Sequence, residues 1–189
     1  REYFDLHETR PTILILGGSQ GAKIINETIT SGLIMMIQKF NIIHQCGESQ
    51  IESVKKDTDR LLKEEASPYA MNVKMYYRYY SFLDEPQLAL AYSLADIIVS
   101  RAASTTLYEI AQLGKPAIII PIFHSPADHQ RLNAFEFNLS GGYLIEESDL
   151  NRDSLVHTIE NILKPELYLK ISEKIKTFAT PFAADKIAE

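Results

Sequence analysis

The sequence predicts a Rossmann-like, doubly wound α/β fold built around a parallel sheet. Short apolar runs rich in Ile and Val alternate with longer segments in which apolar residues recur at helical spacing. This alternation is typical of repeated βα units, whose strands stack in parallel and are covered by helices. With 189 residues, 46% of them hydrophobic, the chain is long enough and apolar enough to form one such domain.

Six apolar runs have the length and composition of buried strands. The predicted strands cover residues 12–16, 41–44, 73–76, 97–100, 117–120 and 143–145. Helical spacing predicts helices over 21–38, 50–65, 86–94, 105–113, 128–139, 152–163 and 166–178. The fourth of these helices has a clear stop, because Gly114 followed by Lys115 and Pro116 is typical of a helix C-terminus.

Charge and cysteine content narrow the class of protein. The formal net charge is −6, which argues against nucleic acid as a partner because phosphate backbones select basic surfaces. If the chain binds an anionic ligand, we therefore expect a small, localised site rather than a broad basic surface. The single cysteine, Cys46, leaves no intrachain disulfide, and the sequence shows neither a signal segment nor an apolar run of membrane length. We therefore expect a cytoplasmic location.

The two ends suggest an excised domain. The chain opens on Arg1 rather than Met, and the first predicted strand begins only at residue 12. We expect a single ligand-binding domain over 1–189, in which 1–10 is an interdomain linker and 182–189 starts a truncated C-terminal helix. An N-terminal domain would then be absent from the chain.

A glycine-rich turn follows the first predicted strand, where ligands bind in doubly wound sheets. It reads Gly17-Gly18-Ser19-Gln20-Gly21-Ala22. Glycines let the backbone turn sharply, and free N–H groups at a helix N-terminus bind phosphate without a basic side chain. Ser19 adds a hydroxyl donor. We interpret the turn as a phosphate site; a turn that serves packing alone is the alternative.

Two better-known phosphate loops do not fit this turn. A Walker A loop needs Lys directly after its last glycine, but Ala22 separates Gly21 from Lys23. The dinucleotide fingerprint needs glycine where Leu16 stands, and no Asp follows the second predicted strand, which ends at His44. NAD is therefore only a runner-up.

Hydroxyl side chains open the helix after the fourth predicted strand. Ser104, Thr105 and Thr106 can offer hydroxyl and backbone donors to a diphosphate or a sugar, or they can simply cap the helix. Glu109 lies one turn further on, where its carboxylate could accept hydrogen bonds from ribose hydroxyls. A solvated glutamate that is favoured by the helix dipole would have the same position.

Polar residues also start the helix after the fifth predicted strand. Asp128, His129, Gln130 and Asn133 suit sugar hydroxyls better than a metal, because no second His or Cys stands at ligand spacing. For His129 alone, a capping or surface role is the alternative. We expect no metal site.

Three other patterns have simpler explanations than chemistry. Asp57-Thr58-Asp59 resembles the DxD of metal-dependent glycosyltransferases, but it lies in a charged helical run that favours a solvated face. The tyrosines within 76–80 could stack on RNA, but in an acidic domain such a cluster more often packs or lines a cleft. Cys46 is expected to be a small buried residue rather than a nucleophile.

In their order along the chain, seven short motifs together resemble the MurG family of glycosyltransferases. They are Gly17–Ala22, His44-Gln45-Cys46-Gly47, Phe82-Leu83-Asp84, Ala95-Asp96, Glu109, Gly114-Lys115-Pro116, and Asp128-His129-Gln130 with Asn133-Ala134. The resemblance extends from the first predicted strand through Gly142. It implies that the chain is the C-terminal half of a GT-B glycosyltransferase, the half that binds the donor.

The resemblance implies an inverting transfer of N-acetylglucosamine from UDP-N-acetylglucosamine to lipid I, which forms lipid II in peptidoglycan synthesis. No cofactor is implied, and the catalytic base is expected in the absent N-terminal domain, which would meet lipid I. The whole protein would lie peripherally on the inner face of the bacterial plasma membrane. A GT-B domain for another UDP-sugar, or a nucleotide-binding module that partners a separate acceptor subunit, are the alternatives.

The resemblance also implies a role for each candidate residue. The diphosphate would lie on the loop containing Gly18, Ser19, Gln20 and Gly21, and the backbone of Leu83 would contact uracil. Ser104, Thr105 and Thr106 would lie beside the phosphates or the sugar, Glu109 would bind the ribose hydroxyls, and Arg1 would reach the nucleotide. The residues that would face N-acetylglucosamine are His129, Gln130 and Asn133. The chain departs from the family at Ala102-Ala103-Ser104, where Ser-Gly-Ala is more usual.

Overall fold

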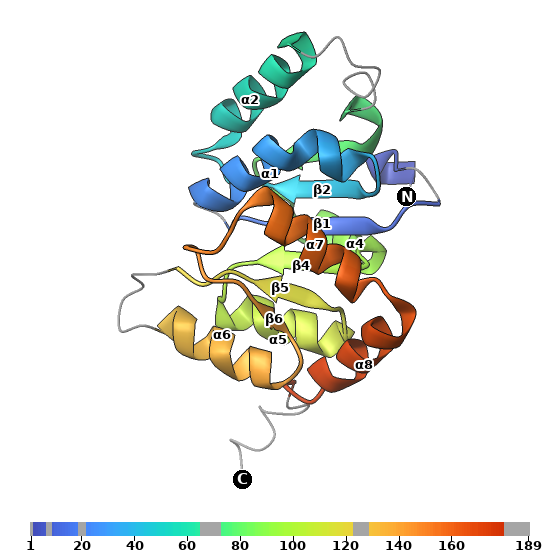
Figure 1. Cartoon of the computed structure of the whole chain (residues 1–189), viewed down its shortest axis with the longest axis vertical. Coiled ribbons are helices and arrows are strands. Elements are labelled where there is room, and N and C mark those ends of the chain that lie inside the picture. Colours follow the sequence, from blue (N-terminus) through green and yellow to red (C-terminus); the bar gives the residue numbers. More distant parts are fainter. Residues whose placement is uncertain (1, 7–8, 19–21, 65–72, 123–128, 180–189) are drawn as a thin grey trace.

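The predicted fold class is confirmed by the computed structural model, which describes residues 2–6, 9–18, 22–64, 73–122 and 129–179. Its centre is a six-stranded parallel sheet in the order β3-β2-β1-β4-β5-β6 (Figure 1). The strands are β1 (Thr12–Leu16), β2 (Asn41–Gln45), β3 (Tyr77–Tyr80), β4 (Ile97–Ser100), β5 (Ala117–Ile119) and β6 (Tyr143–Leu144).

The order of the strands locates the crevice in which a ligand would bind. From β1 the chain adds β2 and then β3 on one side, and it returns to add β4, β5 and β6 on the other side. Ile13 of β1 is paired with Ile42 on one side and with Ile97 on the other. Doubly wound sheets bind ligands at the carboxyl edge beside this reversal. The turns that leave β1 and β4 are therefore the primary candidates.

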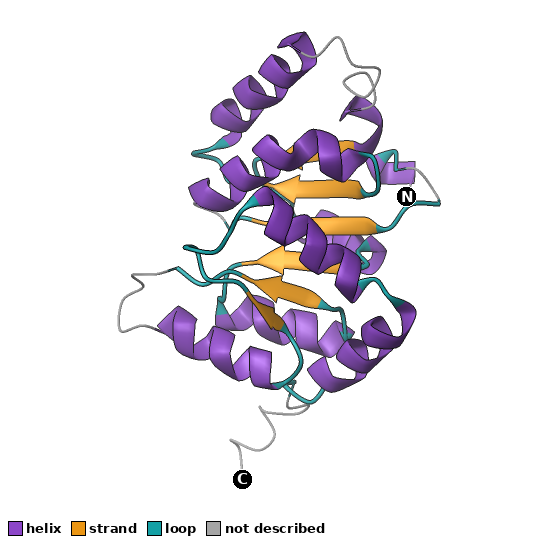
Figure 2. Ribbon diagram, in the orientation of Figure 1, coloured by secondary structure: helices purple, strands orange, loops and turns teal. Residues whose placement is uncertain are grey.

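Helices cover both faces of the sheet (Figure 2). In the view of Figure 1, α1 and α7 lie in front of the sheet, and α4 and α5 lie behind it. The helices are α1 (Lys23–Ile37), α2 (Ile51–Glu64), α4 (Glu85–Leu94), α5 (Ser104–Leu113), α6 (His129–Leu139), α7 (Arg152–Ile162) and α8 (Pro165–Ile175). Among the described residues, no helix is long and apolar enough to cross a membrane.

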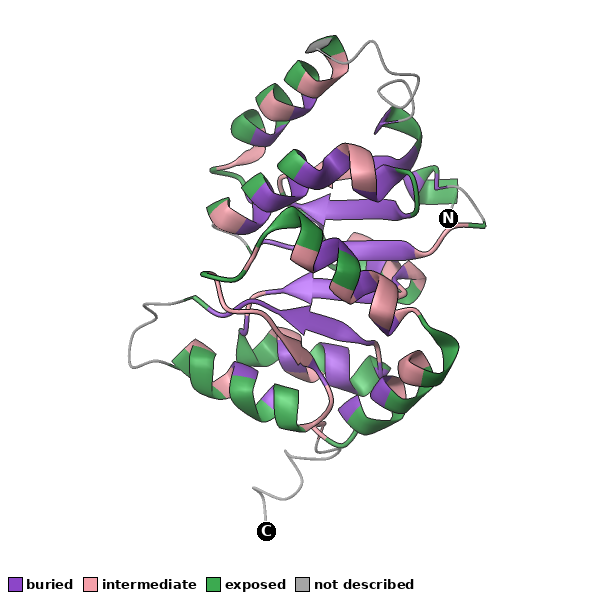
Figure 3. Ribbon diagram, viewed as in Figure 1, coloured by how far each residue is buried: buried purple, intermediate pink, exposed green. Residues whose placement is uncertain are grey.

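The core lies between these layers and includes the central strands themselves. Every residue of β1, β2, β4 and β5 is buried (Figure 3). Strands buried on both faces need continuous apolar runs rather than alternation. This requirement explains why Ile and Val dominate the sequence runs that predicted the sheet.

One predicted strand is wrong. Residues 73–76 are helical, and the strand begins at Tyr77, where it pairs with Ile42 of β2. Val73 and Tyr76 are buried while Met75 is half exposed, and a spacing of three between buried residues suits a helical turn. An apolar run of this length is too short to distinguish the period of a helix from the period of a strand. The other predicted strands and helices agree with the structure to within three residues at each end.

Part of the segment expected to be an interdomain linker packs against the sheet. Glu2–Phe4 form a 3-10 helix, and Phe4 is buried with its ring edge-to-face against Tyr80 at 5.8 Å between centroids. Arg78 of β3 donates a hydrogen bond to the Asp5 carboxylate at 2.6 Å. The helix expected at 182–189 lies outside the described residues.

Candidate functional site

The glycine-rich turn after β1 is tied to the end of β2. The Gly17 amide donates to the Gln45 carbonyl at 2.9 Å, and Gly18 has φ +75, a conformation that favours glycine. A Cβ on Gly17 would lie 3.1 Å from the Gln45 oxygen and 3.2 Å from the Ala22 nitrogen. The turn therefore requires a glycine for close packing as well as for its shape. Ser19, Gln20 and Gly21 lie outside the described residues.

At the carboxyl edge of the sheet, two helix N-termini have an N-cap residue that makes no side-chain hydrogen bond. Ala22 precedes α1 and Ala103 precedes α5, and neither cap has a side-chain hydrogen bond. By contrast, Asp84 at α4 and Asn151 at α7 both form capping boxes. The first N–H groups of an α-helix have no intrahelical partner, so uncapped ends offer donors to an anion.

The capping alternative for the hydroxyl residues of α5 is wrong. Ser104 is already the first residue of the helix, because Ala103 occupies the N-cap position without a side-chain bond. Ser104 and Thr105 are exposed, and Thr106 is partly buried. Their side chains extend from the first helical turn, beside the uncapped N–H groups. Their contact with a diphosphate or a sugar stays a prediction.

The loop between β4 and α5 is braced from two sides. Arg101 donates to the Ile120 carbonyl at 3.0 Å and forms an ion pair with Glu147 at 2.6 Å, with both side chains largely buried. The Asn133 amide donates to the Ala102 carbonyl at 3.1 Å. The sequence singled out Asn133 for the sugar, but the structure shows that its amide nitrogen supports this loop.

The start of α6 holds the other two residues predicted to face the sugar. His129 is the first residue of the helix and is exposed. The side-chain oxygen of Gln130 accepts a hydrogen bond from the Ile122 amide at 3.3 Å. Gln130 and Asn133 thus each bond the backbone of a neighbouring loop. A direct contact of any of the three with a sugar stays a prediction, and Asp128 lies outside the described residues.

Glu109 lies on the second turn of α5 at a groove that faces α4. Its Oε2 accepts a hydrogen bond from the Tyr92 hydroxyl at 2.9 Å. The groove has a volume of about 300 Å³ and is lined by Glu85, Leu88, Ala89, Tyr92, Ser93, Glu109, Gln112 and Leu113. Burial, followed by the hydrogen bond to Glu109, raises the pKa of Tyr92 well above its ordinary value. Within the described part of the chain, the carboxylate is therefore bonded by a neutral hydroxyl and by no cation.

Gln45 is a functional candidate that sequence reasoning missed. Its side-chain oxygen accepts from the Leu83 amide at 3.1 Å, while its own carbonyl accepts from Gly17. Because the Leu83 amide already donates to the side-chain oxygen, a uracil contact through that amide would require the Gln45 side chain to be displaced. The signal in the sequence is a polar pair, His44 and Gln45, at the end of an otherwise apolar strand.

A buried polar chain connects β2 to α1 and β3. His44 Nε2 lies 2.9 Å from the Asn26 side-chain oxygen, and its Nδ1 lies 2.8 Å from the Tyr77 hydroxyl. Because the Asn26 oxygen only accepts, Nε2 carries the proton and Nδ1 accepts from Tyr77. The Asn26 amide nitrogen in turn donates to the Cys46 carbonyl at 3.0 Å. Burial lowers the pKa of His44 to about 3, so the ring is neutral.

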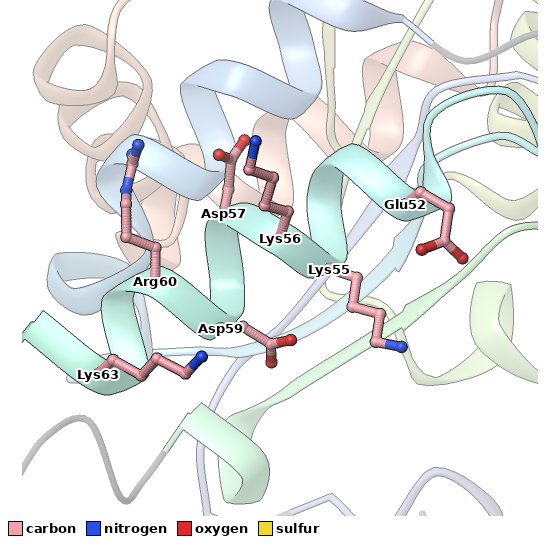
Figure 4. A pocket seen from close by; sticks show the side chains of 7 residues that line it. All are labelled: Glu52, Lys55, Lys56, Asp57, Asp59, Arg60 and Lys63. Carbon is pink, nitrogen blue, oxygen red and sulfur yellow. The ribbon is translucent and has the colours of Figure 1, made fainter.

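The three patterns that the sequence analysis set aside can now be placed in the structure. Asp57 and Asp59 point to different sides of α2 (Figure 4), and both are among the charged residues that line a pocket of about 450 Å³. Among the described residues, no three His, Cys, Asp or Glu side chains gather as metal ligands. Tyr77 is buried and stacks on Tyr79 at 5.4 Å between centroids. Burial raises the pKa of the Cys46 thiol to about 11, which suits the predicted packing role.

Comparisons with known proteins agree with this geometry. A family model described as the glycosyltransferase family 28 C-terminal domain matches residues 12–187. A relative from Thermodesulfovibrio yellowstonii is named UDP-N-acetylglucosamine–N-acetylmuramyl-(pentapeptide) pyrophosphoryl-undecaprenol N-acetylglucosamine transferase. It is 34% identical over 195 residues, which cover 100% of this chain and 49% of that protein. A protein of the same name from Mannheimia succiniciproducens is 33% identical and covers 94% and 46%.

A solved structure is similar over the same span. The crystal structure of Acinetobacter baumannii MurG has a TM-score of 0.77 at 27% identity and covers 98% of this chain and 50% of that one. The predicted resemblance and the GT-B type of fold are therefore confirmed. The chain spans about half the length of the relatives it matches.

Proposed function

We propose that this chain, which belongs to the family of glycosyltransferase family 28 C-terminal domains, binds UDP-N-acetylglucosamine as the donor of a glycosyl transfer. The observation that carries the proposal is the pair of uncapped helix N-termini, at Ala22 and Ala103, on one edge of the sheet. They flank the reversal between β1 and β4, where doubly wound folds bind ligands. A diphosphate is the ligand that suits two such ends.

The remaining parts of the donor follow from this placement. The diphosphate lies between the turn at Gly17-Gly18 and the first turn of α5, and Glu109 binds the ribose hydroxyls. The base lies near Leu83 at the start of α4. The sugar lies toward α6, where His129 is exposed and where Gln130 and Asn133 fix the neighbouring loops. The names of the relatives support N-acetylglucosamine as the sugar.

The proposed acceptor comes from the names of the relatives, and the proposed stabilisation of the leaving group comes from the helix N-termini. The names of the relatives specify a pyrophosphoryl-undecaprenol acceptor, and we propose a lipid-linked acceptor for the whole protein, which would then work at a membrane surface. Helix N-termini can stabilise the charge of a UDP leaving group directly, and we propose that the transfer needs no metal bound to this chain. We assign no general base among the described residues.

Calorimetry with UDP-N-acetylglucosamine, UDP-galactose, UDP and NADH tests the ligand class. We expect UDP and UDP-N-acetylglucosamine to bind and NADH not to bind. Binding of NADH without any uridine nucleotide would overturn the proposal. Preference for UDP-galactose would keep the nucleotide site but change the donor sugar.

The Glu109→Ala variant tests the ribose assignment. It should weaken UDP by about tenfold or more, because hydrogen bonds to a charged group contribute about 1.5–3 kcal/mol. It should leave 2′,3′-dideoxy-UDP nearly unchanged, since that ligand lacks both hydroxyls. Glu85→Ala is the matched control, because it removes a carboxylate from the α4 side of the same groove. Equal losses for both ligands in Glu109→Ala would contradict the assignment.

A further inference from the structure

Tyr92 is held firmly at the point where it meets Glu109. Its side chain is only 6% exposed and belongs to the hydrophobic core, while its hydroxyl bonds Glu109 at the groove. Glu109 itself is exposed. An exposed glutamate is free to sample several rotamers, and ordering it on ligand binding costs conformational entropy. The Tyr92 hydroxyl, which donates a hydrogen bond to Oε2 at 2.9 Å, selects one of these rotamers before the ligand binds.

We propose that Tyr92 is a positioning residue, which fixes the Glu109 carboxylate in the rotamer that accepts the two ribose hydroxyls. This inference rests on the proposed function, since it takes the ribose to lie at Glu109. Tyr92 does not touch the UDP-sugar in this arrangement. It acts only through the carboxylate.

The hydrogen bond leaves the carboxylate able to bind a diol. An ionised carboxylate only accepts, so the phenol must be the donor, and two oxygens together offer about four acceptor sites. Tyr92 uses one site on Oε2. Among the described residues, Glu109 has no other hydrogen-bond partner. Oε1 and the second site of Oε2 therefore remain for the vicinal 2′ and 3′ hydroxyls.

The position of Tyr92 on α4 links it to the base as well. The same helix begins at Asp84, directly after Leu83, and its N-terminus is fixed by a capping box. The start of α4 therefore lies beside the proposed position of the uracil base. Tyr92, which donates the hydrogen bond to Glu109, lies near the end of the same helix. A single rigid helix would set the spacing between the base and ribose contacts.

A Tyr92→Phe variant tests the inference, because it removes one oxygen and leaves the buried ring. Calorimetry on the 189-residue chain should show UDP weakened by about tenfold, the scale of a charge-assisted hydrogen bond, and 2′,3′-dideoxy-UDP changed by less than about twofold. In the Glu109→Ala background the same substitution should have no further effect on UDP, since coupled residues are not additive. Tyr168→Phe, a hydroxyl deletion on α8, is the control and should change neither affinity.

The outcomes separate the inference from the proposed function. If Tyr92→Phe weakens UDP and dideoxy-UDP equally, or weakens neither, Tyr92 does not position Glu109, and the ribose assignment stands as long as Glu109→Ala discriminates. If Glu109→Ala fails to discriminate, the ribose assignment itself is wrong, and the inference is overturned with it. Unfolding temperatures of all variants identify any loss that comes from unfolding, because such a loss affects both ligands alike.

Discussion

Acid should destabilise this protein through one buried histidine, His44, as the pH falls below about 6.5. The pKa of a histidine in an unfolded chain is about 6.5, whereas burial lowers that of His44 to about 3. The groups that face the ring, Asn26 and Tyr77, carry no charge that could favour a protonated form. The folded state therefore stays neutral at His44 as the pH falls through 6.5, while the unfolded state takes up a proton.

The sign and the size follow from this difference. Because the unfolded state binds more protons between pH 6.5 and pH 3, the stability that is present above pH 6.5 is lost progressively across that interval. Between pH 7 and pH 5 the unfolded chain gains about 2 kcal/mol from protonating this one residue. A loss of that size is a large part of the stability of a typical domain.

Urea unfolding at pH 7, 6 and 5 measures the effect in wild type and in His44→Gln. Glutamine can donate to Asn26 near the position of Nε2 but does not titrate. We expect the free energy of unfolding to fall by about 2 kcal/mol more in wild type than in His44→Gln between pH 7 and pH 5. His157→Gln is the matched control, because it makes the same substitution at an exposed position on α7. An identical pH dependence in wild type and His44→Gln would refute the reasoning.

Two further predictions concern the packing around the site. Arg101→Ala removes both the ion pair with Glu147 and the hydrogen bond to the Ile120 carbonyl and should lower the free energy of unfolding by about 3 kcal/mol, measured in urea; an unchanged midpoint would show that water replaces both contacts. Gly142→Ala places a Cβ 2.2 Å from the buried Phe137 ring and should cost about 1–3 kcal/mol. The comparison is Gly18→Ala, whose Cβ meets no described atom within 4 Å and which should cost only about 1 kcal/mol for its positive φ; a larger loss for Gly18→Ala would contradict this account.

The sheet could be predicted from sequence because its strands are buried on both faces. Runs such as 12–16 and 97–100 are apolar throughout, and few other structures accommodate such runs at regular intervals between helices. The error at β3 has the opposite cause. Residues 73–80 mix aromatic, basic and apolar types, and the strand is selected by long-range contacts, such as the bond from Tyr77 to His44. Local spacing carries no information about such a contact.

The candidate site, too, could be predicted from the sequence only in part. Its place in the fold could be predicted, because a glycine turn or a hydroxyl-rich helix start is encoded by neighbouring residues. The direction of each side chain could not. Tyr92 meets Glu109 because α4 packs beside α5, and Asn133 bonds the Ala102 carbonyl because α6 lies beside the loop after β4. Spacing of polar residues therefore identified the edge of the sheet but not the task of each residue there.

The distribution of these tasks would explain how an acidic chain could hold the diphosphate that we propose. Among the described residues near the reversal point, the side chains of Gln45, Arg101 and Asn133 are bonded to the protein itself, and each fixes a loop at the carboxyl edge. The donors that remain in the described part of the chain are backbone N–H groups at the starts of α1 and α5, where the N-cap residues Ala22 and Ala103 make no side-chain bond. Such donors keep a fixed direction and carry no net charge, so they can hold an anion without a basic surface. Affinity would then depend on how rigidly the loops are held, which makes the bracing side chains as important as those that touch the donor.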